Sequence, residues 1–351
     1  MGAPPKGRGG AGRGPRVHTI TLGLLFPLFP VNIYLIDGDV PTLIDTGLNT
    51  DVAWRGLVDG LSAVGRGTGD IKQVVLTHGH IDHVGLCPRL LDEGSPEILI
   101  HWGDAGRVRS DVEELVTLLE SNAARFKKMG IAPRDVDRLF RSYISVLRRF
   151  HVGPFPIREL SDGDVIECGG LTVSIVHTPG HTAGSVCLLD DANRILFSGD
   201  HVMEGTSTNP LAEMIPQKGV GLIPYLASIK RIDDIAPVTI LPGHGTVINK
   251  PAEYLSRITF QHETTAQRIR QSLDADGTTP AELAGRLFPE IGGIAAGSAV
   301  FEVYCRLMEL VEKREAVVDE REGLFHFRGG SETLPAGGHI TSRSSRMRRG
   351  K

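Results

Sequence analysis

The sequence has few cysteines and no closely spaced pair of them. Its 351 residues include four cysteines, and no two of these form a CxxC motif. This distribution argues against a disulfide framework and against a zinc knuckle built from cysteines. Because disulfides are rare in reducing compartments, the distribution is typical of a cytoplasmic protein, and we expect this protein in the cytoplasm.

Long apolar runs are also missing. No stretch approaches the roughly 20 apolar residues that a membrane-spanning helix needs, so we expect no membrane insertion. Residues 1–16 carry positive charge, but no apolar stretch follows them, which argues against a secretory signal. The Gly-, Pro- and Arg-rich composition of residues 1–16 and the polar composition of residues 329–351 predict two disordered basic tails.

The body of the chain has no excess of positive charge. The formal net charge is −4, and each tail contributes +4, so residues 17–328 carry −12. An acidic body is unfavourable for tight nucleic-acid binding, which depends on neutralising phosphates. The hydrophobic fraction of 40% and the charged fraction of 23% are ordinary for a globular protein.

Short apolar runs rich in β-branched residues, cut by Gly, Pro and Asp, predict strands. These runs cover residues 17–23, 31–37, 41–47, 71–77, 97–101, 164–180, 184–190, 194–200 and 238–245. Helical spacing of apolar residues predicts helices over residues 50–65, 86–93 and 222–235, the first of them capped by Thr50. The order, β-rich, helical, then β-rich again, predicts an α+β sandwich.

Two further segments are predicted to be helical. Residues 103–152 form an insertion expected to lie over the β-rich frame, with a capping box that begins at Ser110. Residues 251–328 begin with a long helix and continue with the order helix, helix, hairpin, which is that of a winged-helix module. Thr279 is the expected cap of the helix that follows the long one, with Pro280 in the first position and Glu282 closing a capping box.

The stretch HGHIDH crowds four candidate metal ligands into one loop that leaves a predicted strand. His78 and His80 can converge on one ion, while Asp82 and His83 can face a second ion beside it. Imidazole and carboxylate are the ligands that zinc and similar divalent cations prefer. Gly79 has no side chain to obstruct the tight path of the loop.

Three later turns supply the same kinds of side chain. TPGHTAGS contains His181, FSGDHV contains Asp200 and LPGHG contains His244. Each turn lies at the end of an apolar strand, so one edge of a sandwich could collect all of these side chains.

Together these turns resemble the metallo-β-lactamase superfamily, and LIDTG, with Asp45, resembles the first motif of that family. The resemblance covers roughly residues 17–250 and implies an αββα sandwich, a catalytic domain with its site at one edge. It assigns His78, His80 and His181 to one metal ion, Asp82, His83 and His244 to a second ion, and Asp200 to both. It also implies that Asp45 orients a ligand from outside the metal shell. Alternatively, Asp45 only caps the helix that begins near residue 50.

The implied cofactor is a pair of zinc ions, with iron or manganese as alternatives. Two divalent ions that share a bridging water lower the pKa of that water and supply a hydroxide at neutral pH. Asp82 and Asp200 are the candidate catalytic residues, Asp82 as a proton acceptor or shuttle and Asp200 as the bridge. The HxH pairing favours hydrolytic zinc over the redox di-iron members of the superfamily. His101, His177 and His201 adjoin these motifs and are expected to pack around the site without ligating.

The predicted substrate is a small molecule with an ester, thioester or related acyl bond, hydrolysed in the manner of glyoxalase II. Glyoxalase II itself usually has a histidine where this chain has Gly79, and its glutathione-binding region is not recognisable here. The insertion over residues 103–152 either adds only core or, if it faces the metal edge, forms a lid over the substrate pocket.

The alternative activity is that of a single-strand-specific endoribonuclease. Residues 251–328 resemble the winged-helix domain of a subgroup of these hydrolases, that of β-lactamase-like protein 2. The subgroup includes a mitochondrial enzyme that cuts single-stranded RNA, and it also includes polyketide-associated thioesterases. Residues 262–328 contain eight Lys and Arg against twelve Asp and Glu. This balance favours a structural or dimerising role over nucleic-acid binding. It also disfavours a winged-helix regulator, since the segment lacks a basic recognition helix.

Overall fold

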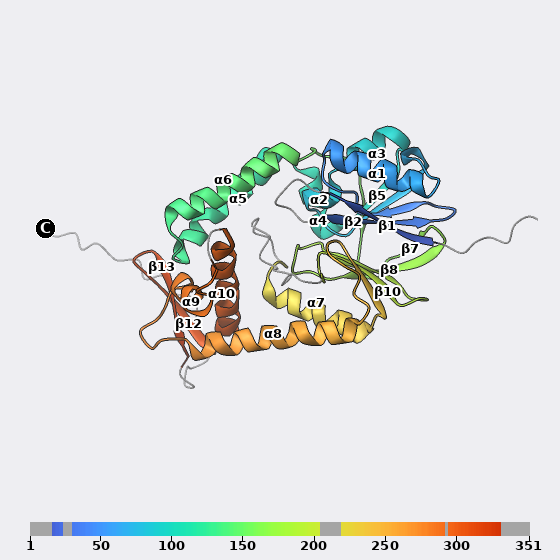
Figure 1. Cartoon of the computed structure of the whole chain (residues 1–351). Coiled ribbons are helices and arrows are strands. Elements are labelled where there is room, and N and C mark those ends of the chain that lie inside the picture. Colours follow the sequence, from blue (N-terminus) through green and yellow to red (C-terminus); the bar gives the residue numbers. More distant parts are fainter. Residues whose placement is uncertain (1–15, 24–29, 204–218, 292–293, 331–351) are drawn as a thin grey trace, which may run out of the picture.

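The computed structural model describes residues 16–23, 30–203, 219–291 and 294–330. The two expected tails, except for a few residues at their inner ends, lie outside this part of the chain. Two sheets form the frame (Figure 1). The first sheet has, in spatial order, β1 (Arg16–Leu22), β2 (Val31–Asp37), β3 (Thr42–Ile44), β4 (Gln73–Leu76), β5 (Glu97–His101) and β6 (Arg158–Leu160). The second has β11 (Thr239–Pro242), β10 (Ile195–Gly199), β9 (Val186–Asp190), β8 (Leu171–His177) and β7 (Val165–Cys168).

The sheets and their flanking helices form four layers. Apolar side chains from both sheets make one buried cluster between them, in which Tyr34 meets Phe197 edge to face at 5.3 Å. The outer face of the first sheet packs against α1 (Asp51–Ala63) and α3 (Cys87–Gly94). The outer face of the second packs against α7 (Leu222–Ile235) and the start of α8 (Pro251–Gln271). This αββα order confirms the predicted sandwich.

Most of the predicted elements are present close to their expected positions. The side chain of Thr50 accepts a hydrogen bond from the Ala53 N–H at 3.1 Å, which confirms Thr50 as the cap of α1. Two short helical turns, η1 (Thr68–Asp70) and α2 (Ile81–Val84), were not predicted. Neither was β6, which extends the first sheet parallel to β5. No helix in the described ranges is both long and apolar enough to cross a membrane.

The insertion contains α4 (Trp102–Arg109), α5 (Val112–Lys128) and α6 (Pro133–Phe150). The capping box expected at Ser110 is wrong by one residue. The Asp111 carboxylate accepts hydrogen bonds from the N–H groups of Glu113 and Glu114, at 2.9 and 3.1 Å, and so caps α5. Ser110 instead ends α4, because its N–H donates to the Gly106 carbonyl at 3.0 Å.

The C-terminal segment continues from α8 into α9 (Pro280–Leu287), α10 (Ile294–Glu312), β12 (Ala316–Arg321) and β13 (Leu324–Gly329). This is the expected order of helix, helix and hairpin. The Thr279 hydroxyl accepts from the Glu282 N–H at 3.2 Å, and the Glu282 carboxylate accepts from the Thr279 N–H at 2.8 Å. The predicted capping box at this position is confirmed.

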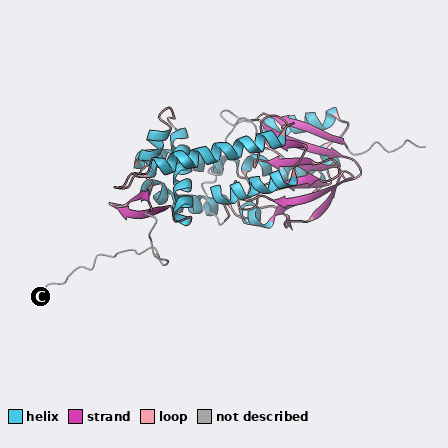
Figure 2. Cartoon of the chain, turned by 90° about the horizontal axis from the view of Figure 1, so that it is seen from below, coloured by secondary structure: helices cyan, strands magenta, loops and turns pink. Residues whose placement is uncertain are grey.

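The α5–α6 hairpin packs against this C-terminal segment. One buried cluster joins apolar residues of α5, α6, the end of α8, α9, α10, β12 and β13. Phe126 of α5 stacks on Phe301 of α10, with 5.0 Å between ring centroids, and meets Phe140 of α6 at 5.2 Å. Figure 1 shows the hairpin and α8 running from the sandwich to the C-terminal segment on opposite sides. Figure 2 shows the large sheets with their flanking helices at one end and the mostly helical C-terminal segment with its small β-hairpin at the other. The expectation that the insertion lies over the β-rich frame therefore holds for α4, which packs beside β5 and β6, and is wrong for most of the α5–α6 hairpin, which extends to the C-terminal segment.

Candidate metal centre

The HGHIDH loop presents its polar side chains from two different backbone conformations. His78 and His80 belong to the loop that follows β4, and the extended backbone at His80 begins α2. Asp82 and His83 then lie within the single turn of α2. The change from loop to helix inside six residues lets one short stretch serve two neighbouring groups of side chains.

The structure brings together all seven side chains that were predicted as ligands. Within each of three groups the candidate ligand atoms lie within 4.8 Å of one another. The groups are His78, His80 and His181; Asp82, His83 and His244; and His78, His83 and Asp200. The first two groups match the two predicted ligand sets, and the third connects them.

Asp200 lies between the two sets. Its Oδ2 is 3.7 Å from His181 Nε2 and 3.5 Å from His244 Nε2, and its Oδ1 is 3.3 Å from His83 Nε2. His181 belongs to the first set, while His83 and His244 belong to the second. The carboxylate therefore lies between the two groups of candidate ligands.

The orientation of the imidazole rings fits metal binding. His83 donates from Nδ1 to the Asp45 carboxylate and His244 donates from Nδ1 to the Pro30 carbonyl, each at 2.8 Å. His78 Nδ1 lies 3.1 Å from the Thr77 hydroxyl. With Nδ1 held from outside, each Nε2 faces the site, which is how metal-ligating histidines are usually arranged.

Two buried polar atoms at the centre of the site also fit metal binding. His83 Nε2 and Asp200 Oδ1 are both buried and lie 3.3 Å apart, and neither has a hydrogen-bond partner with good geometry among the described residues. Unsatisfied buried polar atoms are costly and call for an explanation such as an ion. A divalent cation fits this donor set, since five imidazoles and two carboxylates are ligands that such ions accept.

The charges of the site favour ionised carboxylates. Burial raises the pKa of Asp82, but the imidazoles of His83 and His244 outweigh it and lower this pKa to about 2. The pKa of Asp200 lies well below its ordinary value, because the same two imidazoles outweigh burial there as well. Burial lowers the pKa of His83, but the neighbouring carboxylates outweigh it and raise this pKa well above its ordinary value.

Asp45 is placed to orient a ligand. It is buried, and its Oδ1 accepts from the Thr77 N–H while its Oδ2 accepts from the Thr77 hydroxyl and from His83, all at 2.8 Å. Its backbone φ is +62°, a conformation that is uncommon for a residue other than glycine and that is concentrated at functional sites. Because Thr50 is the cap of α1, the alternative role of Asp45 as a helix cap is wrong.

The other histidines near the motifs pack around the site. The rings of His101 and His177 stack at 4.1 Å, and His177 donates from Nε2 to the Ala183 carbonyl at 2.9 Å. His201 is buried with its ring 4.8 Å from that of Tyr225. None of these three histidines belongs to the candidate ligand groups found among the described residues.

Two supporting residues escaped the sequence analysis. Asn32 of β2 donates to the Pro242 and Gly245 carbonyls at 3.1 and 3.0 Å, and so holds the turn that carries His244. Asp104 of α4 accepts hydrogen bonds from the turn that carries His78 and His80 and from the turn that carries His181. Neither belongs to a motif, and the only signal for Asp104 is its place just after the end of a strand.

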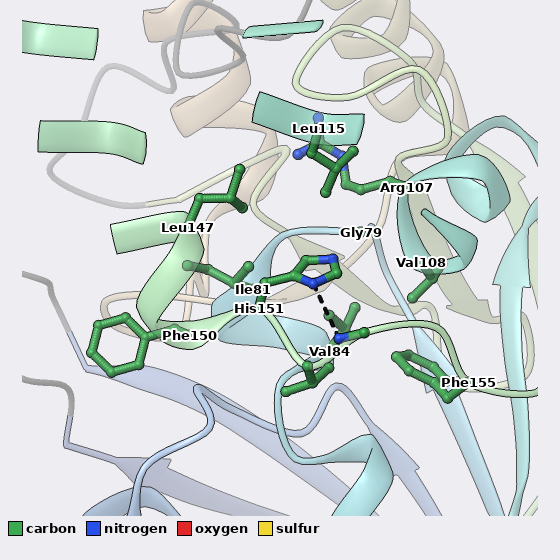
Figure 3. A pocket seen from close by; sticks show the side chains of 12 residues that line it. Gly79, Ile81, Val84, Arg107, Val108, Leu115, Leu147, Phe150, His151 and Phe155 are labelled. Carbon is green, nitrogen blue, oxygen red and sulfur yellow. Dashed lines mark hydrogen bonds between the residues drawn. The ribbon is translucent and has the colours of Figure 1, made fainter. Parts of the chain in front are cut away.

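A small pocket of about 340 Å³, its open mouth included, lies behind the HGHIDH loop. Figure 3 shows its largely apolar lining, to which Ile81 and Val84 of α2 and Leu115 and Leu147 of the insertion contribute. No candidate ligand lines it, so it is separate from the metal centre. Arg107 lies beside the loop here: a Cβ on Gly79 would be 2.8 Å from the Arg107 Cδ.

Comparison with known proteins identifies the family. The family described as the metallo-beta-lactamase superfamily matches residues 26–244. A probable metallo-hydrolase, YqjP of Bacillus subtilis, is 27% identical over 85% of this chain and 92% of its own length. The chicken acyl-coenzyme A thioesterase MBLAC2 is 32% identical over 67% of this chain and 79% of its own.

A solved structure shows the same fold. The metallo-beta-lactamase family protein TTHA1429 of Thermus thermophilus superposes with a TM-score of 0.73 at 23% identity, covering 89% of this chain and 98% of its own. The match includes residues outside the sandwich, since the sandwich alone ends near residue 250. The chain belongs to the metallo-beta-lactamase superfamily and is a hydrolase of that type.

Proposed function

We propose that this protein is a dinuclear metal-dependent hydrolase that cleaves the acyl bond of a small-molecule thioester or ester. The observation that carries the proposal is the convergence of seven imidazole and carboxylate side chains around Asp200. The similarity to an acyl-coenzyme A thioesterase supports a thioester as the first substrate to test.

The proposed metal ligands are the residues of the two ligand sets predicted from the sequence, together with Asp200. His78, His80 and His181 would hold one ion, Asp82, His83 and His244 would hold a second, and Asp200 would be a ligand of both. Zinc is the proposed metal, because a set of imidazoles and carboxylates suits it. Bound divalent cations would lower the pKa of a water molecule towards neutrality and would polarise the carbonyl of the substrate.

The protein itself supplies ligand orientation and a proton acceptor. Asp45 fixes the ring of His83 through Nδ1, and the Pro30 carbonyl fixes the ring of His244. The Asp82 side chain is 20% exposed and that of His244 is 13% exposed, whereas His83 is fully buried. Asp82 and His244 are therefore within reach of a substrate, as is the partly exposed His80 of the first set. Asp82 has a low pKa and is ionised, so we propose that it orients the attacking water and takes up its proton only transiently.

The proposed domain division follows the sequence. Residues 17–250 form the catalytic domain, with the insertion at 103–152, and residues 251–328 form a winged-helix-like domain. The order of α9, α10 and the β12–β13 hairpin supports the winged-helix assignment. Because α10 and β13 share a core with the insertion, we infer a structural role for this domain, compatible with a homodimer and distinct from nucleic-acid binding.

We propose that this protein belongs to a subgroup of the superfamily with chemistry like that of glyoxalase II but with a substrate site that differs from that of glyoxalase II. Arg107 fills the space beside Gly79, where glyoxalase II usually has a histidine side chain. This packing supports a substrate other than the glutathione thioester of glyoxalase II.

One assay panel tests the proposal. The purified protein is analysed for bound metal and tested on acyl-coenzyme A thioesters, simple thioesters, lactones, a cephalosporin and single-stranded RNA. We expect about two zinc ions per chain and hydrolysis of a thioester. His80→Ala is expected to lose at least about 100-fold in kcat/KM, whereas His18→Gln, distant from the site, retains full activity.

Two results would contradict the proposal. A protein that retains no metal after purification without chelators would exclude a metal-dependent hydrolase. RNA cleavage that is lost in His80→Ala, with no hydrolysis of any acyl substrate, would replace it with the endoribonuclease.

A further inference from the structure

Asp104 is a fully buried carboxylate that joins two separate turns of the metal centre. It lies in the first turn of α4 and is 0% exposed. Its Oδ2 accepts from the Gly79 N–H at 2.8 Å and from the Thr182 hydroxyl at 2.7 Å. Its Oδ1 accepts from the Gly184 N–H at 2.7 Å. Three donors thus satisfy a carboxylate that would otherwise be costly to bury.

The donors are immediate neighbours of candidate ligands. Gly79 lies between His78 and His80, and Thr182 directly follows His181. These three histidines make up the first ligand set, in which His80 Nδ1 is 2.9 Å from His78 Nε2 and 3.0 Å from His181 Nε2. One side chain therefore determines how the turn with two of these histidines sits against the turn with the third.

The backbone is shaped to bring α4 this close. A Cβ on Gly184 would lie 2.3 Å from the Asp104 nitrogen and 2.7 Å from its Cγ. A Cβ on Gly103 would lie 2.8 Å from the Ala183 carbonyl oxygen. Contacts this short are tolerated only by glycine on both sides of the interface. The start of α4 and the turn after His181 are thus packed so closely that neither Gly103 nor Gly184 has room for a side chain.

Asp45 makes the equivalent contacts on the other side of the centre. It holds His83 of the second ligand set and the Thr77 backbone at the end of β4. The two buried carboxylates share no donor. Asp45 contacts a ligand of the second set directly, and it reaches the first set only through Thr77, whose hydroxyl lies 3.1 Å from His78 Nδ1. This separation gives each of them a distinct expected effect.

We propose that Asp104 is a positioning residue for the metal ion of the His78, His80 and His181 set, an inference that rests on the proposed metal ligation. Its carboxylate locks the two turns so that the three imidazoles keep the geometry of one ion. Other contacts hold the fold itself, including the backbone bond from the Val186 N–H to the Thr77 carbonyl at 2.9 Å. Loss of Asp104 therefore affects one ion more than the fold.

The test is a metal titration of four proteins after removal of bound metal. Wild type, Asp104→Asn, Asp45→Asn and Asp162→Asn are titrated with Co²⁺, followed by the visible spectrum and by calorimetry. An amide cannot accept all three hydrogen bonds of Asp104, because its nitrogen faces a donor on one side or the other. Asp162 is a control for the Asp-to-Asn change itself. Its partly exposed carboxylate pairs with Arg231 and accepts from the His177 N–H at 2.8 Å, and it has no hydrogen bond to a neighbour of a ligand.

Asp104→Asn is expected to weaken one of the two Co²⁺ sites about 10- to 100-fold, the usual effect of losing an outer-shell partner, and to change its spectrum. Asp45→Asn is expected to weaken the other site more than the first, which it reaches only through Thr77, and Asp162→Asn is expected to weaken neither. Combining Asp104→Asn with His181→Ala should add little further loss at the first site, because both changes act on the same ion. Combining it with His244→Ala should weaken both sites.

Thr182→Val is a milder second variant that removes one bond to Asp104 and keeps the side-chain shape. It is expected to weaken the same site as Asp104→Asn by a smaller factor. The inference is overturned if Asp104→Asn binds both ions as wild type does, if it weakens both sites equally, or if its effect is additive with that of His181→Ala. A wild type that binds no ion would overturn the proposed function as well, whereas an unaffected Asp104→Asn beside a two-ion wild type overturns this inference alone.

Discussion

At the scale of single residues, the packing beside the metal loop makes Gly79 sensitive to substitution. A Cβ there would meet the Arg107 side chain at 2.8 Å and the Asp104 Cβ at 3.4 Å. We expect Gly79→Ala to destabilise the protein by about 1–3 kcal/mol, the usual cost of overpacking, and Gly79→His to destabilise it more. Thermal unfolding of the metal-free proteins measures this difference.

The control lies in the same neighbourhood. Gly106 is also in α4, and a Cβ there would meet nothing within 4 Å. Gly106→Ala should therefore be neutral or stabilising by up to about 1 kcal/mol, through helix propensity. Adding Arg107→Ala should recover part of the stability lost in Gly79→Ala. If the double variant is no more stable than Gly79→Ala, the steric role of Arg107 is wrong.

The seven candidate ligands could be predicted from the sequence because each belongs to a short motif. Asp200 and His244, for example, each follow a strand that ends in a recognisable turn. Asp104 could not be predicted, since its importance comes from contacts with residues 25 and 78 positions away in the sequence. Local patterns identify the groups that carry chemistry, but the groups that hold them in place are selected by the tertiary fold.

At the scale of secondary-structure elements, helical spacing predicted that α5 and α6 each bury one face, but it did not identify the partner. That partner is the C-terminal segment, through a cluster that includes Phe126, Phe140 and Phe301. An amphipathic pattern reports which side of a helix is buried and contains no information about what covers it. The capping box at Thr279 was predictable because all its partners lie within four residues.

The shared core predicts that the insertion and the C-terminal segment lose stability together. Phe126→Ala should cost about 3–5 kcal/mol, as expected for a buried phenylalanine. Hydrogen exchange should show lost protection in α5, α6, α9 and α10, with the sheets of the sandwich unchanged. Leu118→Ala is the control, because Leu118 of α5 is 45% exposed. Loss of protection confined to α5 and α6 would contradict a common core.

At the scale of the whole molecule, α8 connects the two ends of the structure. Its first half packs on the second sheet through Leu255, and Ile269 near its end enters the core of the C-terminal segment. Between them lies His262, whose carbonyl and Nδ1 both accept hydrogen bonds from Arg306 of α10. The His262 ring is also 5.8 Å from that of Tyr225 in α7. This histidine of α8 therefore contacts two other helices, α7 and α10, where the catalytic and C-terminal parts meet.

This junction should make stability depend on pH. Burial, followed by the charge of Arg306, lowers the pKa of His262 to about 4. The unfolded chain, with a histidine pKa of about 6.5, binds the proton more readily, so the stabilisation is complete above about pH 6.5 and is lost as the pH falls towards 4. At pH 5 the loss amounts to about 2 kcal/mol.

The variant His262→Asn tests this assignment, because asparagine keeps an acceptor for Arg306 but does not titrate. Urea unfolding of the metal-free proteins at pH 7 and pH 5 should show a smaller pH-dependent loss for His262→Asn than for wild type. Since His101 and His201, whose pKa values are also lowered, remain in both proteins, only the difference between the two reports on His262, and equal losses would contradict this assignment.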